Sequence, residues 1–136
     1  MRFDTKIAVV LRTDVAVWQR LNMVAFLVSG IAARTEDIIG ADYEDGSGRR
    51  YLPMFRQPVL VFGSDNAGIR SAYERAVARE LALSIFTDEL FATSHDEANR
   101  AAVAAVPSAT LALAGIALYG ERKKVDAVVK GLSLHA

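Results

Sequence analysis

Three polar side chains follow one apolar run near the start of the chain. The stretch KIAVVLRTD (residues 6–14) is rich in β-branched residues and ends in Arg12, Thr13 and Asp14. The carboxyl ends of strands are where α/β proteins usually bind ligands. Arg12 could clamp an anion through two parallel hydrogen bonds, and Asp14 could act as a general base. The alternative is structural, because Thr13 and Asp14 are also residue types that cap helices.

Further polar residues follow the other expected strands. They are Ser64, Asp65 and Asn66 after residues 59–62, Thr87 and Asp88 after residues 82–86, and Tyr119 at the end of residues 110–119. If these strands are adjacent and parallel, all of these groups converge on one edge of the sheet. Asp88 is then a second candidate general base, and Ser64 a candidate ligand-binding residue. Ser64 or Asp65 could instead cap the helix that follows.

The helix expected at residues 18–34 adds Trp18, Arg20 and Asn22 as candidate ligand-binding residues. Trp18 is large enough to line a pocket or to anchor an interface, and burial in the core is the alternative. The centre of this helix, residues 23–28, is apolar on all sides. We therefore expect the sheet to cover one side, and a neighbouring element or a second subunit to cover another. A homodimer is one expected assembly.

The amino-acid composition limits the kinds of functional site that this chain can form. The chain has no cysteine, which excludes disulfides, thiolate nucleophiles and cysteine-ligated metal sites. His95 and His135 have no partner at metal-ligand spacing, so we expect no metal and no cofactor. The 16 basic and 16 acidic side chains give a formal charge of zero, whereas nucleic-acid-binding proteins normally carry a basic excess. Nucleic acid is therefore not an expected partner, although tRNA is not excluded.

The order of the elements predicts the fold class. Expected strands at residues 7–11, 59–62, 82–86 and 110–119 alternate with expected helices at 18–34, 67–81, 94–106 and 121–130. This alternation favours an α/β fold, a three-layer α/β/α sandwich around a mostly parallel or mixed sheet of at least four strands. The turn-rich EDGSG between residues 38–43 and 50–54 predicts a hairpin.

Other boundaries follow from local patterns. Ser94 and Glu97 have the spacing of a capping box at the start of the third helix. The length of 136 residues suits one domain, residues 1–136. We find no signal-peptide pattern and no apolar stretch long enough to cross a bilayer, so we expect a cytoplasmic protein without a membrane partner.

The chain resembles the type-2 peptidyl-tRNA hydrolase superfamily at both ends. That family's first strand also ends in Arg-x-Asp, and PSATLALAGIALYG (residues 107–120) with the helix after it is similar to the family's last strand and helix. The segment WQRLNMVAF (residues 18–26) is most similar to an uncharacterised subfamily, a domain of unknown function. The resemblance implies a type-2 peptidyl-tRNA hydrolase-like fold and, for active members, hydrolysis of peptidyl-tRNA.

Two motifs of the active hydrolases are missing. Those enzymes enter the first helix through Gly-Lys-x-Ala-Ala-Gln, whose lysine is implicated in catalysis, whereas this chain has Arg20, Leu21 and Asn22. Their Asp-Ala-Gly-Arg-Thr-Gln motif is replaced by Asp88 followed by ELFAT. Since arginine keeps its proton, it could hold a phosphate but could not shuttle a proton as a lysine does.

The sequence therefore favours a protein that binds a small molecule or a partner at the strand edge without the hydrolase chemistry. The candidate ligand-binding residues are Arg12, Thr13, Asp14, Trp18, Arg20, Asn22 and Ser64, and the candidate catalytic residues are Asp14 and Asp88. One alternative is a peptidyl-tRNA hydrolase with a rearranged active site. Another is an oligomeric scaffold, which depends on the apolar helix alone.

Overall fold

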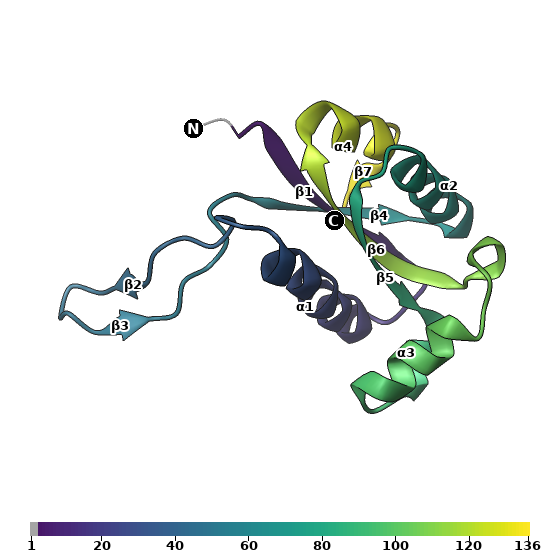
Figure 1. Cartoon of the computed structure of the whole chain (residues 1–136), viewed down its shortest axis with the longest axis horizontal. Helices are drawn as coiled ribbons and strands as arrows, with labels where there is room; N and C mark the ends of the chain where they lie inside the picture. Colours follow the sequence, from purple (N-terminus) through teal and green to yellow (C-terminus); the bar gives the residue numbers. More distant parts are fainter. Residues whose placement is uncertain (1–2) are drawn as a thin grey trace.

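The computed structural model describes residues 3–136 (Figure 1). Its strands are β1 (Thr5–Arg12), β2 (Tyr43–Glu44), β3 (Arg50–Tyr51), β4 (Val59–Ser64), β5 (Ala82–Thr87), β6 (Leu113–Glu121) and β7 (Ser133–Leu134). Its helices are α1 (Val17–Arg34), α2 (Asn66–Ala78), α3 (Asp96–Ala104) and α4 (Arg122–Val129), with short 3-10 segments η1 (Asp88–Ala92) and η2 (Ser108–Thr110). The main expected strands and helices are all present, with ends shifted by three residues at most.

The main sheet is mixed rather than mostly parallel. Its order is β5-β6-β1-β4-β7, and among the strands of the described chain only the β1–β4 pair is parallel. The alternation of strands and helices does not fix strand direction, and β6 enters between β1 and β5 in the opposite sense. Tyr119 therefore pairs with Ile7 and Ala82, at the end of the sheet opposite Arg12. Its predicted place among the other polar residues is wrong.

Helices cover both faces of the sheet (Figure 1). Alternate residues of β1 divide between the faces, as expected for a strand buried on both sides. Val9 and Leu11 pack with Met23 and Leu27 of α1 on one face. Val10, on the other face, belongs to the cluster that includes residues of α2 and α4. Burial of this central strand fixes the position of its polar end.

α1 is covered on one side only. Met23, Leu27 and Ile31 are buried against the sheet. Trp18 and Leu21 are 68% and 69% exposed, so the alternative of a core tryptophan is wrong. No neighbouring element of residues 3–136 covers this outer side. The second covering layer that the apolar pattern predicts is therefore not supplied by this part of the chain.

The expected hairpin forms an arm that projects from the sheet (Figure 1). We call residues 39–57 the arm. Its strands β2 and β3 pair with each other and not with the main sheet. Every residue from 41 to 52 is exposed. The arm leaves the body at the carboxyl end of α1 and points away from it.

α3 begins differently from the prediction. Its N-terminal cap is His95, whose Nδ1 accepts a hydrogen bond from the backbone nitrogen of Ala98 at 3.3 Å. The Ser94–Glu97 capping box is therefore wrong, because the extended backbone at the cap lies one residue later. α3 has no buried residue and lies beyond the β5 edge of the sheet (Figure 1). No helix of residues 3–136 is both long and apolar enough to cross a bilayer.

The tip of the arm should loosen in acid. The Tyr51 hydroxyl and the backbone nitrogens of Arg49 and Ser47 donate to the carboxylate of Asp45, and these bonds lower its pKa below the ordinary value. The hydrogen bond between the Tyr51 hydroxyl and Asp45 also raises the pKa of Tyr51, since it favours the neutral phenol. A lowered pKa in the folded tip stabilises it above the ordinary aspartate value of 3.8, and this contribution is lost as the pH falls through the lower folded pKa.

We expect the amide NMR signals of Ser47 and Arg49 to shift together below about pH 3.8 as these bonds break. The Asp45→Asn variant should lack this transition, while Asp42→Asn, also in the arm, should keep it. Signals that stay constant in acid in the native chain would contradict the expectation.

Candidate functional site

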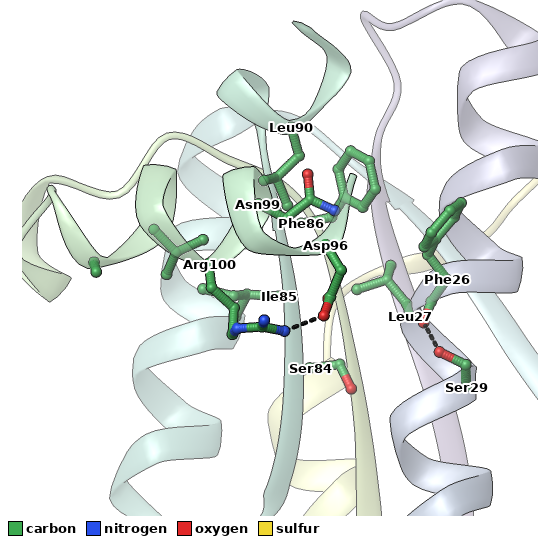
Figure 2. A pocket seen from close by; sticks show the side chains of 12 residues that line it. Phe26, Leu27, Ser29, Ser84, Ile85, Phe86, Leu90, Asp96, Asn99 and Arg100 are labelled. Atoms are coloured by element: carbon green, nitrogen blue, oxygen red, sulfur yellow. Dashed lines mark hydrogen bonds and ion pairs between the residues drawn. The ribbon is translucent and has the colours of Figure 1, made fainter. Parts of the chain in front are cut away.

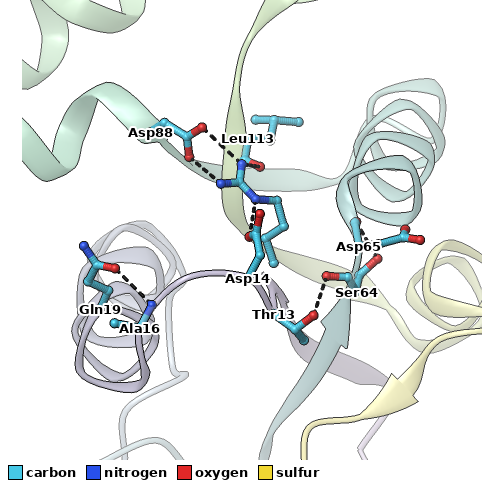
Figure 3. Close-up of polar contacts among 9 residues, drawn as sticks. Thr13, Asp14, Ala16, Gln19, Ser64, Asp65, Asp88 and Leu113 are labelled. Carbon is cyan, nitrogen blue, oxygen red and sulfur yellow. Dashed lines mark hydrogen bonds and ion pairs between the residues drawn. The ribbon is translucent and has the colours of Figure 1, made fainter.

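Arg12 contacts Asp14, Asp88 and Leu113, which Figure 3 shows close together at one end of the sheet. Its Nε donates to Oδ1 of Asp14 at 2.7 Å. Its Nη1 and Nη2 lie 3.2 and 3.0 Å from the two carboxylate oxygens of Asp88, and Nη1 also donates to the carbonyl of Leu113 at 3.1 Å. The ends of β1 and β5 and the start of β6 are thereby tied together.

The guanidinium of Arg12 already holds an anion from the protein itself. The paired contact that an external carboxylate or phosphate would use is taken by Asp88. Burial acts to lower the pKa of Arg12, but the hydrogen bonds and charges of Asp14 and Asp88 outweigh it and raise the pKa above the ordinary value. Arg12 is 12% exposed, and it remains a cation whose charge is matched within the fold.

Thr13, Ser64 and Asp65 make local structural contacts. The backbone nitrogen and hydroxyl of Thr13 lie 3.0 and 3.4 Å from the carbonyl oxygen of Ser64. Asp65 caps α2 by accepting from the backbone nitrogen of Gly68 at 2.8 Å, which is one of the two alternatives that the sequence left open. α1 is not capped by Thr13 or Asp14. Instead, the side chain of Gln19 accepts from the backbone nitrogen of Ala16.

A second arginine lies beside an apolar cavity. The cavity has a volume of about 390 Å³, and we call it the Arg20 pocket; its lining residues are Leu11, Val17, Arg20, Leu21, Val24, Val61 and His135. Nη1 of Arg20 lies 2.8 Å from Nε2 of His135, while the buried Nε of Arg20 has no hydrogen-bond partner in residues 3–136. No carboxylate in this part of the chain forms an ion pair with Arg20.

Trp18 and Asn22 lie in a different place, on the outer side of α1. They line a hollow of about 440 Å³ that adjoins a larger one of about 590 Å³. We call the two together the α1–α3 groove. Figure 2 shows the larger hollow with side chains from α1, β5, η1 and α3 around it, including Phe26, Phe86 and Leu90. The seven candidate ligand-binding residues are thus divided among three surfaces.

Comparison with known proteins places the chain. A family model described as "Protein of unknown function (DUF2000)" matches residues 5–136. The chain belongs to the DUF2000 family. A solved structure of a protein of unknown function, Atu0240 from Agrobacterium tumefaciens strain C58, is 47% identical, and the match covers 99% of this chain and 100% of that one with a TM-score of 0.96. The comparison with curated proteins gave no match.

The sequence predicted the residues around Arg12 better than those around Arg20. The sequence predicted that Arg12, Asp14 and Asp88 lie at one edge of the sheet. The structure places them together there, because β1 and β5 run in the same direction. The sequence did not predict His135 as a neighbour of Arg20. β7 pairs with β4 over two residues only, and the backbone nitrogen of His135 donates to the carbonyl of Val61 at 2.8 Å. A strand this short has too few residues to show a pattern.

Side chains that could bind a metal do not cluster in the described part of this DUF2000 protein. Residues 3–136 contain no group of three or more His, Cys, Asp or Glu side chains close enough to hold an ion.

The neutral histidine tautomer with its proton on Nδ1 fits both contacts of His135, since Nδ1 lies 2.7 Å from the backbone oxygen of Ala136 and Nε2 accepts from Arg20. The site is therefore an arginine and a histidine beside apolar walls.

Proposed function

We propose that this protein binds a small molecule with an apolar body and an anionic group in the Arg20 pocket, without the hydrolase chemistry of the peptidyl-tRNA hydrolases. The observation that carries the proposal is the buried Nε of Arg20, which has no partner in residues 3–136. The walls contributed by β1, β4 and α1 are apolar, and the volume of about 390 Å³ is within the range of small-molecule sites.

The chemistry of arginine selects an anion. A guanidinium cannot lose its proton in a protein, so its buried donors need acceptors. His135 supplies one neutral acceptor to Nη1 but no charge. A carboxylate or phosphate group would give both the missing acceptor and the missing negative charge, and charge-assisted bonds of this kind are the stronger ones. Leu11, Val24 and Val61 would cover the apolar part of the ligand.

The same residues argue against hydrolysis. Arg20, Leu21 and Asn22 occupy the stretch where active type-2 hydrolases carry their lysine, and none of the three can shuttle a proton as lysine does. Asp14 and Asp88 are both held by Arg12, which leaves neither carboxylate free of an ion pair. From the sequence resemblance, we also propose that the fold is similar to that of the type-2 peptidyl-tRNA hydrolases.

Titration with octanoate tests the proposal. We expect octanoate to bind more tightly than octanol, which has the same chain and no charge. Arg20→Met, which keeps the apolar stem, should weaken octanoate about tenfold to a hundredfold, because a hydrogen bond to a charged group contributes about 1.5–3 kcal/mol. Octanol binding should stay unchanged in this variant. Calorimetry or NMR titration measures both ligands.

Two further variants sharpen the result. Arg34→Met, in the last turn of the same helix, is the matched control and should bind octanoate like the native chain. Leu21→Asn should weaken octanoate and octanol together, because it removes apolar wall and leaves Arg20 in place. Equal affinities for octanoate and octanol, or an Arg20→Met variant that binds octanoate normally, would overturn the proposal.

The competing function is a peptidyl-tRNA hydrolase with a rearranged active site, using Arg12, Asp14, Arg20 and Asp88. In its favour, Asp14 and Asp88 lie at one edge and are 68% and 45% exposed, so a solvent-borne substrate could reach them. Robust turnover of peptidyl-tRNA by the pure protein would replace the binding proposal with this one. Absence of tRNA binding at low salt would remove it, because phosphate contacts are strongest there.

A further inference from the structure

Between its root and its turn, the arm has one face without a charged side chain. Asp45 and Arg49 end this face at the tip, where the Tyr51 hydroxyl donates to Asp45. Tyr43 pairs with Tyr51, and Ile39 with Phe55, in one register, so the odd-numbered residues share a face. From root to tip this face presents Ile39, Ala41, Tyr43, Tyr51, Pro53 and Phe55. The opposite face carries Asp42, Glu44, Arg50 and Arg56 together with Leu52 and Met54. One face of the arm is thus less charged than the other, as in a pair of strands that packs one side against another surface.

Phe55, at the root of that face, packs against the core beside α1, but nothing in residues 3–136 covers the two tyrosines farther out. Tyr43 and Tyr51 are 50% and 49% exposed, and Ile39 is 37% exposed. A two-stranded hairpin is marginally stable in water unless its apolar side packs against another element. An arm whose residues 41–52 are all exposed therefore needs a partner surface to be well ordered.

The chain itself carries a matching surface on α1. The exposed residues of α1 before its last position are Val17, Trp18, Leu21, Asn22, Ala25, Phe26, Ser29, Gly30 and Ala33, and none of them is charged. Large side chains lie toward the start of the helix and small ones toward its end, where a chain could approach closely. α1 has 18 residues and so spans about 27 Å, and the five residues from Ile39 to Tyr43 span about 17 Å, so the uncharged face of the arm fits along part of the helix.

The arm cannot reach this surface within one molecule. It starts just after the carboxyl end of α1 and points away from the body, whereas Trp18 lies in the first turn at the other end (Figure 1). A second copy can present its own α1 to the arm. Two copies related by a twofold axis would each give one arm and receive one, so every such surface is covered. A formal charge of zero leaves no net repulsion between them.

We infer that the protein forms a twofold homodimer in which the odd-numbered face of each arm lies on the exposed side of α1 in the other copy, next to the α1–α3 groove. This inference does not depend on the ligand proposed for the Arg20 pocket, although Val17 and Leu21 belong both to that pocket and to the exposed side of α1. Trp18 and Phe26 border the groove and would contact the arm of the other copy. The dimer supplies the second covering layer that α1 lacks in the single chain.

The absence of native cysteines makes the contact directly testable. Tyr51→Cys in the arm and Ala25→Cys on α1 are prepared separately with different tags, mixed, and treated with a short bis-maleimide linker. We expect a mixed dimer that carries both tags. Val77→Cys is the control, because Val77 is 52% exposed on α2 across the sheet, and it should give no mixed product with Tyr51→Cys.

Sedimentation of the untreated protein gives the second measurement. The native chain should be a dimer at tens of micromolar, and Trp18→Ser should shift it toward monomer with an unchanged circular dichroism spectrum, since Trp18 lies outside the core. A monomeric native chain would overturn the inference. So would cross-linked dimers formed by Tyr51→Cys alone or by Ala25→Cys alone in place of the mixed product, because these indicate arm-to-arm or helix-to-helix contact.

Discussion

Replacing Arg12 with methionine is expected to destabilise the fold by about 2–3 kcal/mol. The side chain is 12% exposed and holds three elements at once, through Asp14, Asp88 and the carbonyl of Leu113. Methionine can follow the apolar part of the arginine stem. It leaves the carbonyl of Leu113 without this donor and the two carboxylates without their cation. Urea unfolding at neutral pH measures the loss as a lower midpoint with an unchanged slope.

Arg100→Met is the matched control for this prediction. Arg100 pairs with Asp96 on α3, but both side chains are largely exposed, at 66% and 80%. An exposed pair of this kind contributes about 0–1 kcal/mol. Within the Arg12 cluster, Asp88→Asn should cost more than Asp14→Asn, because Asp88 receives both terminal nitrogens and Asp14 is the more exposed. Equal midpoints for Arg12→Met and Arg100→Met would show that the cluster adds nothing to stability.

The Arg12 prediction also separates stability from function. If Arg12 is a structural clamp and the Arg20 pocket is the ligand site, the folded Arg12→Met variant should bind octanoate with native affinity. Its side chain does not line the pocket, and its guanidinium is occupied by Asp88. The sequence placed both arginines in one group of candidate residues, and only the geometry divides them.

Local patterns were sufficient for most of the fold. The β-branched run before Arg12 predicts a buried strand, and the apolar residues 18–34 predict a long helix, because burial on a sheet requires these periodicities. Strand direction was not predictable. The segment between β5 and β6 contains a helix, as a parallel crossover would, but α3 lies at the edge of the sheet and β6 returns antiparallel.

The candidate site was predictable only in part, and the reason is distance along the chain. Asp88 reaches Arg12 from 76 residues away because two strands end at the same edge, which the order of elements indicates. His135 reaches Arg20 across 115 residues through a two-residue strand, which no local pattern marks. The outer side of α1 and the arm are exposed because no other part of residues 3–136 packs against them. Their apolar composition alone would predict a place in the core.

Gly115→Val is expected to destabilise the protein by about 3 kcal/mol, because it would push α1 away from the sheet. Gly115 of β6 lies beneath α1. A Cβ there would be 3.0 Å from Cδ1 of Leu27, 3.1 Å from Sδ of Met23 and 3.2 Å from Cδ2 of Leu11. These contacts are already tight for one carbon, and valine adds two more. Gly115→Ala should cost about 1 kcal/mol. Gly30→Ala, whose Cβ would lie 3.4 Å from Oγ of Ser84, should be neutral or stabilising.

A double-mutant cycle identifies the cause of this loss. Met23→Ala alone opens a cavity and should cost about 2–5 kcal/mol, but Met23→Ala with Gly115→Val should cost less than the two single losses together, because the valine fills the space that the methionine leaves. Additive losses would place the strain of Gly115→Val in the β6 backbone instead. Leu11 borders both Gly115 and the Arg20 pocket. A displaced α1 should therefore also weaken octanoate binding in the folded Gly115→Val variant, and Met23→Ala should restore part of it.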